Sequence, residues 1–521
     1  MSQKLIAVAC SILWSGTMMA QTDTTAGPGE WRIAGQNLSN TRGQGTESQI
    51  GISNVGQLAT RWVFETGADV SATPTVAGNA VYFPDWAGNL FAVNAHTGQL
   101  LWSRQISDYN GRSGSISRVS PAVFANELIF GDNVKSSAVH DGAHVMAVDR
   151  NTGAMLWITQ VDAHPAAVIT GSPVFNGSVV YIGVSSNEEG LATDPAYPCC
   201  TFRGSVVALD AVTGAILWKT FVVPDNKGQT NAYSGGAIWQ PPAIDPVRGS
   251  LFIGTGNNYT VPQSVLTCQQ DAVAAGNPNA VCTSADDHFD AALALDLNTG
   301  AIKWSMGVMA FDAWTVACLS SLKAIHCPQP SGPDFDLGGS GPNLLSNMVG
   351  FGQKSGTFWA MNPDTGTILW AAKVGPGSTL GGIEWGTATD GSRIYVAITN
   401  ADHIALSLPD GTSTTAGSWA ALDASTGKVV WQIADPLGAL DLGSLTVANG
   451  VLYAPSFSGF VYGLNALTGK VLFQFNTGGS VIDGPSIVDG SVYWGSGYSH
   501  ISPGIGNNKV FAFSLPSVSG Q

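Results

Sequence analysis

The 521-residue sequence predicts an all-β fold, an eight-bladed β-propeller of four-stranded blades that is closed by pairing of its N- and C-terminal strands. Three observations lead to this prediction. Glycine accounts for 64 residues, about 12% of the chain against an ordinary usage of roughly 7%. A phrase that predicts a hairpin recurs along the chain, and the two ends carry complementary parts of one further copy.

The composition argues against several classes of protein. Only 11% of the residues are charged and 44% are hydrophobic, whereas disordered chains and coiled coils are rich in charge. The formal net charge of -15 argues against a nucleic-acid partner, since phosphate binding needs a basic surface. Beyond the N-terminal segment, no stretch approaches the ~20 apolar residues of a transmembrane helix, so we expect no membrane span.

Residues 1–20 are expected to be a secretory signal peptide. Lys4 supplies a positive charge, residues 5–14 form a short apolar core, and we expect cleavage after Ala20. The remainder, 21–521, is expected to be a single propeller domain of a periplasmic or secreted protein. The alternative is that the N-terminal segment stays in place as a membrane anchor.

The recurring phrase consists of apolar residues, an Asp or Asn, two variable residues, Thr-Gly, and a second apolar run that usually ends in Trp. It occupies residues 91–102, 146–157, 207–218, 293–304, 359–370, 420–431 and 462–473. Each copy predicts strand, turn and strand, because the Asp or Asn side chain can bond to the turn backbone and the Gly accepts a positive φ. We expect the repeated Trp to pack between neighbouring blades.

A second hairpin precedes most copies, as in residues 73–83, 172–181, 450–453 and 490–493. Two hairpins in each period make a four-stranded blade. Residues 510–513 begin an eighth copy but lack its last strand, and residues 58–62 resemble that missing strand. Joining the two would close the ring and remove the exposed sheet edges. Long loops are left at about 105–120, 186–204, 258–290 and 310–345, where function is expected to concentrate.

The cysteines favour a disulfide framework. Cys10 lies in the signal segment, and the six others are Cys199, Cys200, Cys268, Cys282, Cys318 and Cys327. An even count in an oxidising compartment predicts disulfides, and three local pairs are the simplest of fifteen connectivities. The adjacent cysteines would form a strained ring, and strain is typical of functional sites, although two separate thiols are the alternative. The sequence contains no Cys-x-x-Cys-His, so no covalent c-type haem is expected.

The repeat resembles that of the quinoprotein alcohol dehydrogenases over nearly all of the chain after the signal segment. This resemblance implies an eight-bladed propeller that binds pyrroloquinoline quinone (PQQ) with Ca²⁺ or a lanthanide ion on its axis. The repeat is specific for the fold rather than for the activity, because non-enzymatic propellers of the outer-membrane assembly type share it. The residues of the loops therefore have to distinguish the two functions.

Two segments resemble the family's metal ligands. Residues 182–190 resemble the strand end that delivers a glutamate, and their position implies Glu188, with Glu189 as the fallback. Residues 254–257 resemble the motif whose asparagine, here Asn257, supplies a side-chain oxygen. Carboxylate and amide oxygens are the donors that hard cations prefer.

Other segments resemble the family's cofactor site. Trp239 corresponds to the aromatic floor under the quinone ring, and Lys354 to the cation that touches the quinone oxygens. Arg118 and Thr170 lie where the family contacts the carboxylates of the cofactor. The catalytic base, which removes the alcohol proton, falls at Asp334 or Asp336.

The sequence does not decide which of two aspartates, Asp334 or Asp336, is the catalytic base. Asp336 is favoured because Phe335 precedes it and Leu337 follows it, as the family pattern requires. If Asp334 is the base, Asp336 becomes a further metal-binding carboxylate and resembles that of the lanthanide-using members.

Within the family, the chain resembles the branch of the polyvinyl alcohol dehydrogenases. Residues 198–205, with Cys199 and Cys200, and residues 381–386, with Glu384 and Trp385, carry this resemblance and are expected to line the cofactor pocket. In methanol-type enzymes the adjacent cysteines precede the metal glutamate, but here they follow Glu188. Members of this branch often carry a haem c domain, and its absence from this sequence implies an external cytochrome c as electron acceptor.

The resemblance therefore predicts an enzyme that oxidises primary or secondary alcohol groups, including those of small molecules or polymers, to carbonyls. The implied mechanism is base-assisted hydride transfer to metal-polarised PQQ. Two alternatives remain: a propeller scaffold of the outer-membrane assembly type that binds no cofactor, and a quinoprotein that acts on aldehydes or sugars.

Overall fold

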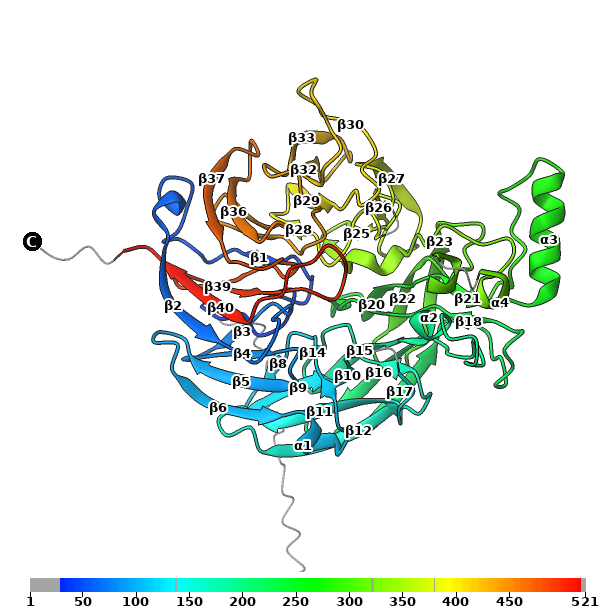
Figure 1. Ribbon diagram of the computed structural model, residues 1–521, viewed down its shortest axis with the longest axis horizontal. Helices are drawn as coiled ribbons and strands as arrows, with labels where there is room; N and C mark the ends of the chain where they lie inside the picture. Colours follow the sequence, from blue (N-terminus) through cyan, green and yellow to red (C-terminus); the bar gives the residue numbers. More distant parts are fainter. Residues whose placement is uncertain (1–28, 136–137, 320–322, 379, 517–521) are drawn as a thin grey trace, which may run out of the picture.

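The structure of the protein is a computed structural model that describes residues 29–135, 138–319, 323–378 and 380–516. Its four-stranded antiparallel sheets are arranged radially in a ring, and the chain passes around this ring from one sheet to the next (Figure 1). The described residues form eight such units, six of them four-stranded sheets and two of them extended to five strands by a short additional strand, which confirms the predicted eight-bladed propeller. The predicted signal peptide, residues 1–20, lies outside the described residues and stays a prediction.

The blades are numbered here along the chain from blade 1 to blade 8. Blades 1 to 4 consist of these strands: in blade 1, β3(Thr75–Ala77), β4(Ala80–Pro84), β5(Asn89–Asn94) and β6(Leu100–Gln105); in blade 2, β8(Ala122–Phe124), β9(Glu127–Gly131), β11(Ala143–Asp149) and β12(Met155–Asp162); in blade 3, β14(Val174–Asn176), β15(Val179–Ser186), β16(Ser205–Asp210) and β17(Ile216–Phe221); in blade 4, β19(Ala243–Asp245), β20(Ser250–Gly254), β22(Ala291–Asp296) and β23(Ile302–Gly307). Blades 5 to 8 consist of these strands: in blade 5, β24(Asn343–Leu345), β25(Met348–Gly352), β26(Thr357–Met361) and β27(Ile368–Lys373); in blade 6, β28(Ala388–Thr389), β29(Arg393–Ile398), β32(Ser418–Asp423) and β33(Val429–Ala434); in blade 7, β34(Thr446–Ala448), β35(Val451–Pro455), β36(Phe460–Asn465) and β37(Val471–Asn476); in blade 8, β38(Ser486–Val488), β39(Ser491–Ser496), β40(Lys509–Ser514) and β2(Ala59–Glu65).

Blade 8 closes the ring from both ends of the chain, as predicted. Its outer strand β2 pairs antiparallel with β40, from Ala59 opposite Ser514 to Glu65 opposite Lys509. The N-terminal segment also crosses toward the centre, where β1(Gly43–Gln44) pairs parallel with β34 of blade 7. These pairings tie the beginning of the described chain to its last two blades.

The repeated turn joins neighbouring blades as well as neighbouring strands. In the third copy, Asp210 Oδ1 accepts hydrogen bonds of 2.8 Å from both the backbone amide and the hydroxyl of Thr213. Gly214 follows with φ 71°, and a Cβ on this glycine would lie 2.5 Å from the ring of Trp157 in the preceding blade. The indole of Trp157 donates to the carbonyl of Ala211, 2.9 Å away. The expected packing of the repeated Trp between blades is confirmed.

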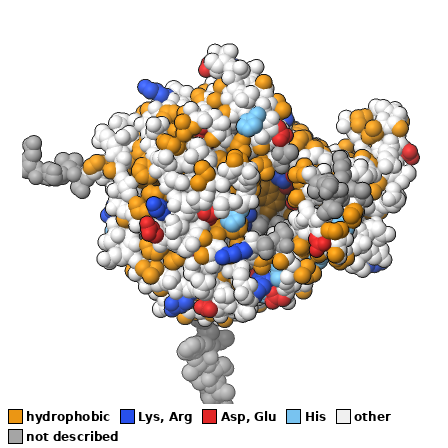
Figure 2. All heavy atoms as spheres, viewed as in Figure 1, with side chains coloured by type: hydrophobic (Ala, Val, Ile, Leu, Met, Phe, Trp, Pro, Cys, Tyr) orange, Lys and Arg blue, Asp and Glu red, His pale blue; other side chains and the backbone are white. Residues whose placement is uncertain are grey.

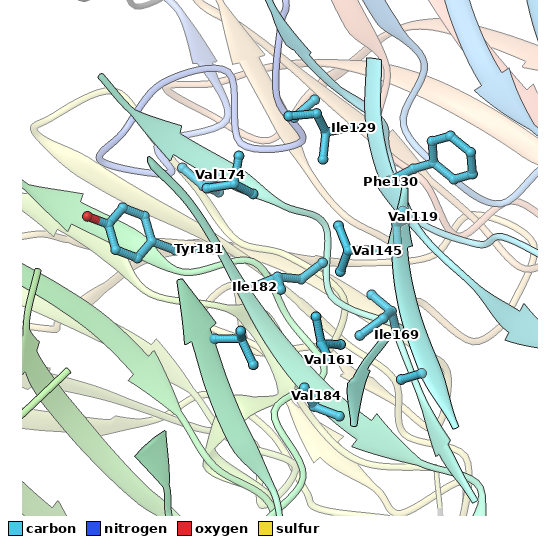
Figure 3. Close-up of a cluster of buried hydrophobic side chains, with 14 of the residues drawn as sticks. Val119, Ile129, Phe130, Val145, Val161, Ile169, Val174, Tyr181, Ile182 and Val184 are labelled. Atoms are coloured by element: carbon cyan, nitrogen blue, oxygen red, sulfur yellow. The ribbon is translucent and has the colours of Figure 1, made fainter. Parts of the chain in front are cut away.

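The hydrophobic core lies between the faces of adjacent blades. Figure 3 shows the contact between blades 2 and 3, where Ile129 and Val145 approach Val174 and Ile182. All four side chains are buried, because each blade is covered on both faces by its neighbours. This two-sided burial explains the high apolar content and low charge of the sequence.

The remaining elements lie in the loops between and within the blades. They are the short strands β7(Ser115–Ile116), β10(Asn133–Val134), β13(Ala167–Val168), β18(Ser234–Gly235), β21(Asn258–Thr260), β30(Leu406–Ser407) and β31(Ser413–Thr414), and the helices η1(Val55–Gln57), α1(Ser107–Asn110), α2(Glu188–Leu191), α3(Gln263–Ala274), η2(Val316–Leu319), α4(Lys323–His326) and η3(Leu337–Ser340). Helix α3, which the sequence analysis does not anticipate, projects from the ring in Figure 1. No helix within the described ranges is both long and apolar enough to cross a bilayer.

The disulfides follow the simplest predicted connectivity. Cys268, in the middle of α3, is bonded to Cys282 in the segment that follows this helix, and Cys318 and Cys327 close a second loop. Cys199 and Cys200 are bonded to each other.

Candidate active site

The centre of the candidate site is Lys354, whose ammonium group lies between two aspartates. Lys354 Nζ is 2.9 Å from Asp334 Oδ1 and 2.9 Å from Asp336 Oδ2. Lys354 lies in the turn between β25 and β26, and the two aspartates immediately precede η3. The structure therefore brings together three of the residues predicted from the sequence.

A further buried carboxylate, Asp312, holds the segment that carries the two aspartates. Asp312 Oδ1 accepts from the backbone amide of Asp334 at 3.2 Å, and its Oδ2 from that of Phe335 at 2.7 Å. Asp290 lies beside Asp312 and is 0% exposed, and neither of its carboxylate oxygens accepts from an N–H group of the described residues. Burial raises the pKa of Asp312 to about 7 and that of Asp290 well above its ordinary value. One shared proton would relieve the repulsion between these two groups.

Asp336 is held through both of its oxygens. Besides the contact with Lys354, its Oδ1 accepts from the backbone amide of Asn257 at 2.7 Å. The Asn257 amide donates through Nδ2 to the carbonyls of Asn258 and Trp314, at 2.8 and 2.9 Å. Because both of its N–H groups are engaged, the side-chain oxygen of Asn257 is directed to the opposite side and is available as an acceptor.

Glu188, the expected metal ligand, lies against the loop that follows Cys199 and Cys200. Its carboxylate is fully buried and accepts hydrogen bonds from the hydroxyl of Tyr197 and the backbone amides of Thr201 and Phe202, at 2.8–2.9 Å. Glu188 therefore anchors the loop that follows Cys199 and Cys200. Which of the two adjacent glutamates faces Lys354 depends on the geometry of α2.

Glu189, the fallback residue, is the one that faces the Lys354 cluster, the name used here for Lys354, Asp334, Asp336, Glu189 and Glu384. Its Oε1 is buried and has no hydrogen-bond partner among the described residues. Burial raises the pKa of Glu189 to about 7, with Lys354 acting against this shift and Asp336 adding to it. A buried carboxylate oxygen without a partner costs free energy unless a proton or a cation satisfies it.

The Lys354 cluster contains one cationic group and four carboxyl groups. Burial opposes the charge of Lys354, but Asp334 and Asp336 outweigh it and raise the pKa of the ammonium group well above its ordinary value. Burial raises the pKa of Glu384 to about 7 and that of Asp334 well above its usual range, in both cases against the effect of Lys354. The cluster as a whole is short of positive charge.

An aromatic surface borders the cluster. The ring centroid of Trp239 is 5.7 Å from Lys354 Nζ and 5.4 Å from the ring of Trp385, which meets it at 70°. Cys200 is fully buried, and Cys199 packs against the same hydrophobic cluster that contacts Trp239. The face of the Trp239 indole is a flat, apolar surface of the kind that a planar ligand requires.

Arg118 and Thr170, the expected contacts of the cofactor carboxylates, line one cavity together with Trp385. The Arg118 guanidinium lies 4.7 Å from the ring of Trp385, 5.4 Å from that of Trp86 and 5.8 Å from that of Tyr498. It donates to the Tyr498 hydroxyl at 3.3 Å, and among the described residues no carboxylate forms an ion pair with it. Figure 2 shows that the face viewed along the ring axis is hollowed, with basic and hydrophobic atoms visible inside.

The residues present fit a cation and a planar anionic cofactor. Glu189 Oε1 lacks a partner, Asn257 presents an amide oxygen, and Asp336 adds a second carboxylate. In the described part of the chain, no group of three or more His, Cys, Asp or Glu side chains is arranged to hold a metal ion by itself. Arg118, held by aromatic rings and without a carboxylate partner, is suited to an anionic ligand group.

Asp312, Asp290, Trp86 and Tyr498 take part in the site, but the sequence analysis does not identify them. The two aspartates lie in or beside long loops whose positions become visible only when the chain folds. No spacing pattern links them to Asp334, because they act through backbone amides and through each other.

Comparisons with known proteins place the chain in a family. A family profile described as "Outer membrane protein assembly factor BamB" matches residues 56–196, 139–306 and 415–514. A polyvinyl alcohol dehydrogenase from Pseudomonas sp. is 30% identical over 94% of this chain and 77% of its own length. A polyvinyl alcohol dehydrogenase from Sphingopyxis sp. is also 30% identical, over 89% of this chain and 73% of its own.

Solved structures agree on the fold. The quinohemoprotein alcohol dehydrogenase of Comamonas testosteroni superposes with a TM-score of 0.69 at 18% identity, over 94% of this chain and 81% of that one. A europium-containing methanol dehydrogenase superposes with a TM-score of 0.67 at 17% identity, over 94% and 99%. The similarity of sequence and fold over most of the chain shows that this protein belongs to the family of the quinoprotein alcohol dehydrogenases that includes the polyvinyl alcohol dehydrogenases.

Proposed function

We propose that this protein is a PQQ-dependent dehydrogenase that oxidises primary or secondary alcohol groups to carbonyls, including those of polymers such as polyvinyl alcohol. The observation that carries the proposal is the Lys354 cluster, in which a buried oxygen of Glu189 without a partner lies near two aspartates bridged by a lysine. A scaffold that binds no cofactor has no need of this costly arrangement.

Glu189, Asn257 and Asp336 would hold a Ca²⁺ or lanthanide ion. They offer two carboxylates and one amide oxygen, the donors that hard cations take. The additional positive charge would offset the excess of carboxyl groups around Lys354. The metal would thus stabilise the site as well as serve the reaction.

PQQ would lie against Trp239, with Lys354 beside the quinone oxygens. Arg118 and Thr170 would bind its carboxylates, and Trp385 and the Cys199–Cys200 pair would enclose it. When bound, PQQ together with the metal supplies the polarised acceptor for the two electrons that leave the alcohol carbon.

Asp334 is the better candidate for the base. Asp336 uses both oxygens, one for the Asn257 amide and one for Lys354, whereas Asp334 contacts Lys354 through Oδ1 alone. Asp334 Oδ2 is therefore available to take the alcohol proton. This assignment differs from the sequence pattern, which favours Asp336, and it gives Asp336 the role of metal ligand.

Electrons would leave the site to an external carrier, which we propose to be a cytochrome c. A periplasmic or secreted location would allow this exchange, and it agrees with the disulfides in the structure.

The test is reconstitution of residues 21–521 with PQQ and Ca²⁺ or a lanthanide ion. We expect metal-dependent binding of PQQ, followed by absorbance and dye-linked turnover on primary and secondary alcohols. Asp334→Asn should lower kcat by about 10²–10⁴-fold with PQQ still bound, the usual contribution of a general base. If the protein binds no PQQ with any of these metals, the proposed dehydrogenase activity is contradicted, and the alternative of a propeller scaffold without a cofactor is favoured. Turnover restricted to aldehydes or sugars would contradict the substrate class.

A further inference from the structure

We infer that an apolar groove beside the candidate site binds the carbon chain of the alcohol, beyond the hydroxyl group that reacts. This inference rests on the proposed function and names the substrate as a long or polymeric neutral alcohol. The groove has a volume of about 620 Å³, within the roughly 300–1,000 Å³ that is common for ligand sites.

The groove extends over loops of several consecutive blades. Leu380 lies between β27 and β28, Leu440 between β33 and β34, and Phe457 between β35 and β36. Ile501 and Ile505 lie between β39 and β40 of blade 8. Leu319 joins them from the loop between β23 and β24, so the groove spans loops of several blades and has room for an extended ligand.

The groove lies next to the candidate site, and the two are separated by packed side chains of one hydrophobic cluster. Leu380 adjoins Gly381, where a Cβ would lie 2.8 Å from Lys354 Cγ and would also meet the carboxylate of Glu384. Phe457 is 6.5 Å from the ring of Tyr498, and Tyr498 is 6.4 Å from Trp385, the neighbour of Trp239. A chain lying in the groove would therefore lie beside the aromatic residues that border the Lys354 cluster.

The chemistry of the lining selects a neutral chain with hydroxyl groups. None of the described residues that line the groove is Asp, Glu, Lys or Arg, and the polar side chains are those of His403, Ser458 and Ser502. Ile505 is 51% exposed, and Leu319 at the edge of the groove is 60% exposed. Covering such side chains with CH₂ groups is favourable by about 25 cal/mol per Å². Alternating CH₂ and CHOH groups match a wall that is mainly apolar with scattered hydroxyls.

The test compares Ile505→Asp and Leu319→Asp with Leu467→Asp. Leu467 is a matched control because it is 52% exposed but lies in the turn between β36 and β37, outside the groove. Binding of polyvinyl alcohol oligomers to the protein without PQQ is measured by calorimetry. With PQQ and metal added, the ratio of kcat/KM for the oligomers to kcat/KM for 2-propanol is measured for the same variants.

We expect each groove variant to weaken oligomer binding and to lower the ratio by roughly tenfold, a change of about 1.4 kcal/mol. Leu467→Asp should leave both unchanged. Unaltered oligomer binding in both groove variants would overturn the inference. If the groove variants lower turnover when cytochrome c is the electron acceptor but not when a dye is, the groove binds the electron acceptor instead of the substrate. If the wild-type protein oxidises no alcohol of any length, the proposed function fails, while the calorimetry still tests the groove.

Discussion

Glu188 and Glu189 have the same side chain and adjacent positions, but the structure gives them different partners. Both lie at the start of α2, where successive residues point about 100° apart. Glu188 is thereby directed to the backbone amides of Thr201 and Phe202, and Glu189 to the Lys354 cluster. The difference follows from the direction in which β15 delivers the chain into the helix.

We expect the substitution of Gln for Glu to affect metal binding at position 189 and the free energy of unfolding at position 188. Glu189→Gln should weaken metal binding by at least roughly tenfold and reduce metal-dependent turnover, because a neutral amide replaces a carboxylate ligand. The free energy of unfolding of the metal-free protein should stay the same or rise, since the substitution removes a buried charge. Calorimetric titration with Ca²⁺ and lanthanide ions and chemical denaturation would measure these changes.

Glu188→Gln is the matched control. It should lower the free energy of unfolding by about 1–3 kcal/mol, because one oxygen that accepts from a backbone amide is lost while the metal ligands remain. If Glu188→Gln abolishes metal binding and Glu189→Gln does not, our reassignment of the ligand is wrong.

At the scale of the element, the Thr-Gly turn explains why the repeat is so regular. Its glycine accepts a positive φ, and it also leaves room for the Trp ring of the preceding blade. The same contact recurs at Gly98, Gly153, Gly214, Gly300, Gly366, Gly427 and Gly469. The turn chemistry alone predicts the positive φ, but the second requirement is visible only in the contact between blades.

A pair of glycine substitutions separates the two requirements within blade 4. Gly249→Ala should cost roughly 1–2 kcal/mol, because φ is 58° but no atom lies within 4 Å of the new Cβ. Gly300→Ala should cost roughly 1–3 kcal/mol more, because its Cβ would overlap the ring of Trp218 and lie 2.6 Å from Thr220 Oγ1. The free energies of unfolding from urea denaturation would compare the two. Equal costs would contradict a packing role for this glycine.

At the scale of the whole molecule, the N-terminal segment joins blades that the chain reaches only hundreds of residues later. Arg42 is buried and donates to the carbonyls of Leu445 and Ala34 and to the hydroxyl of Thr73. Asp483 and Arg42 both line the cavity that contains Arg118 and Thr170. The Asp483 carboxylate oxygen Oδ1 has no hydrogen-bond partner among the described residues. Burial raises the pKa of Asp483 to about 8, against the opposing effect of Arg42.

This raised pKa predicts how stability depends on pH. The unfolded chain releases the Asp483 proton near pH ~4, but the folded protein keeps it until about pH 8. The folded state therefore binds more protons in this window, and the contribution of Asp483 to the unfolding free energy falls as pH rises from about 4 to 8. Asp483→Asn removes this dependence. The variant should gain about 1–4 kcal/mol relative to the wild-type protein between pH 5 and pH 8, as measured by chemical denaturation. Parallel pH profiles would contradict the prediction.

The sequence by itself determined the number of blades, the closure by β2 and β40, and the packing of Trp between blades. These features depend on periodicity and turn chemistry, which are local and repeat along the chain. It also indicated Trp239, Asn257, Lys354 and the pair Asp334 and Asp336, because their motifs are short and contiguous. The tertiary structure alone decided that Glu189 rather than Glu188 faces the Lys354 cluster. It also decided that Asp312 accepts hydrogen bonds from the backbone amides of Asp334 and Phe335. Those roles arise where loops of different blades converge, so the direction of each side chain depends on how separate segments pack.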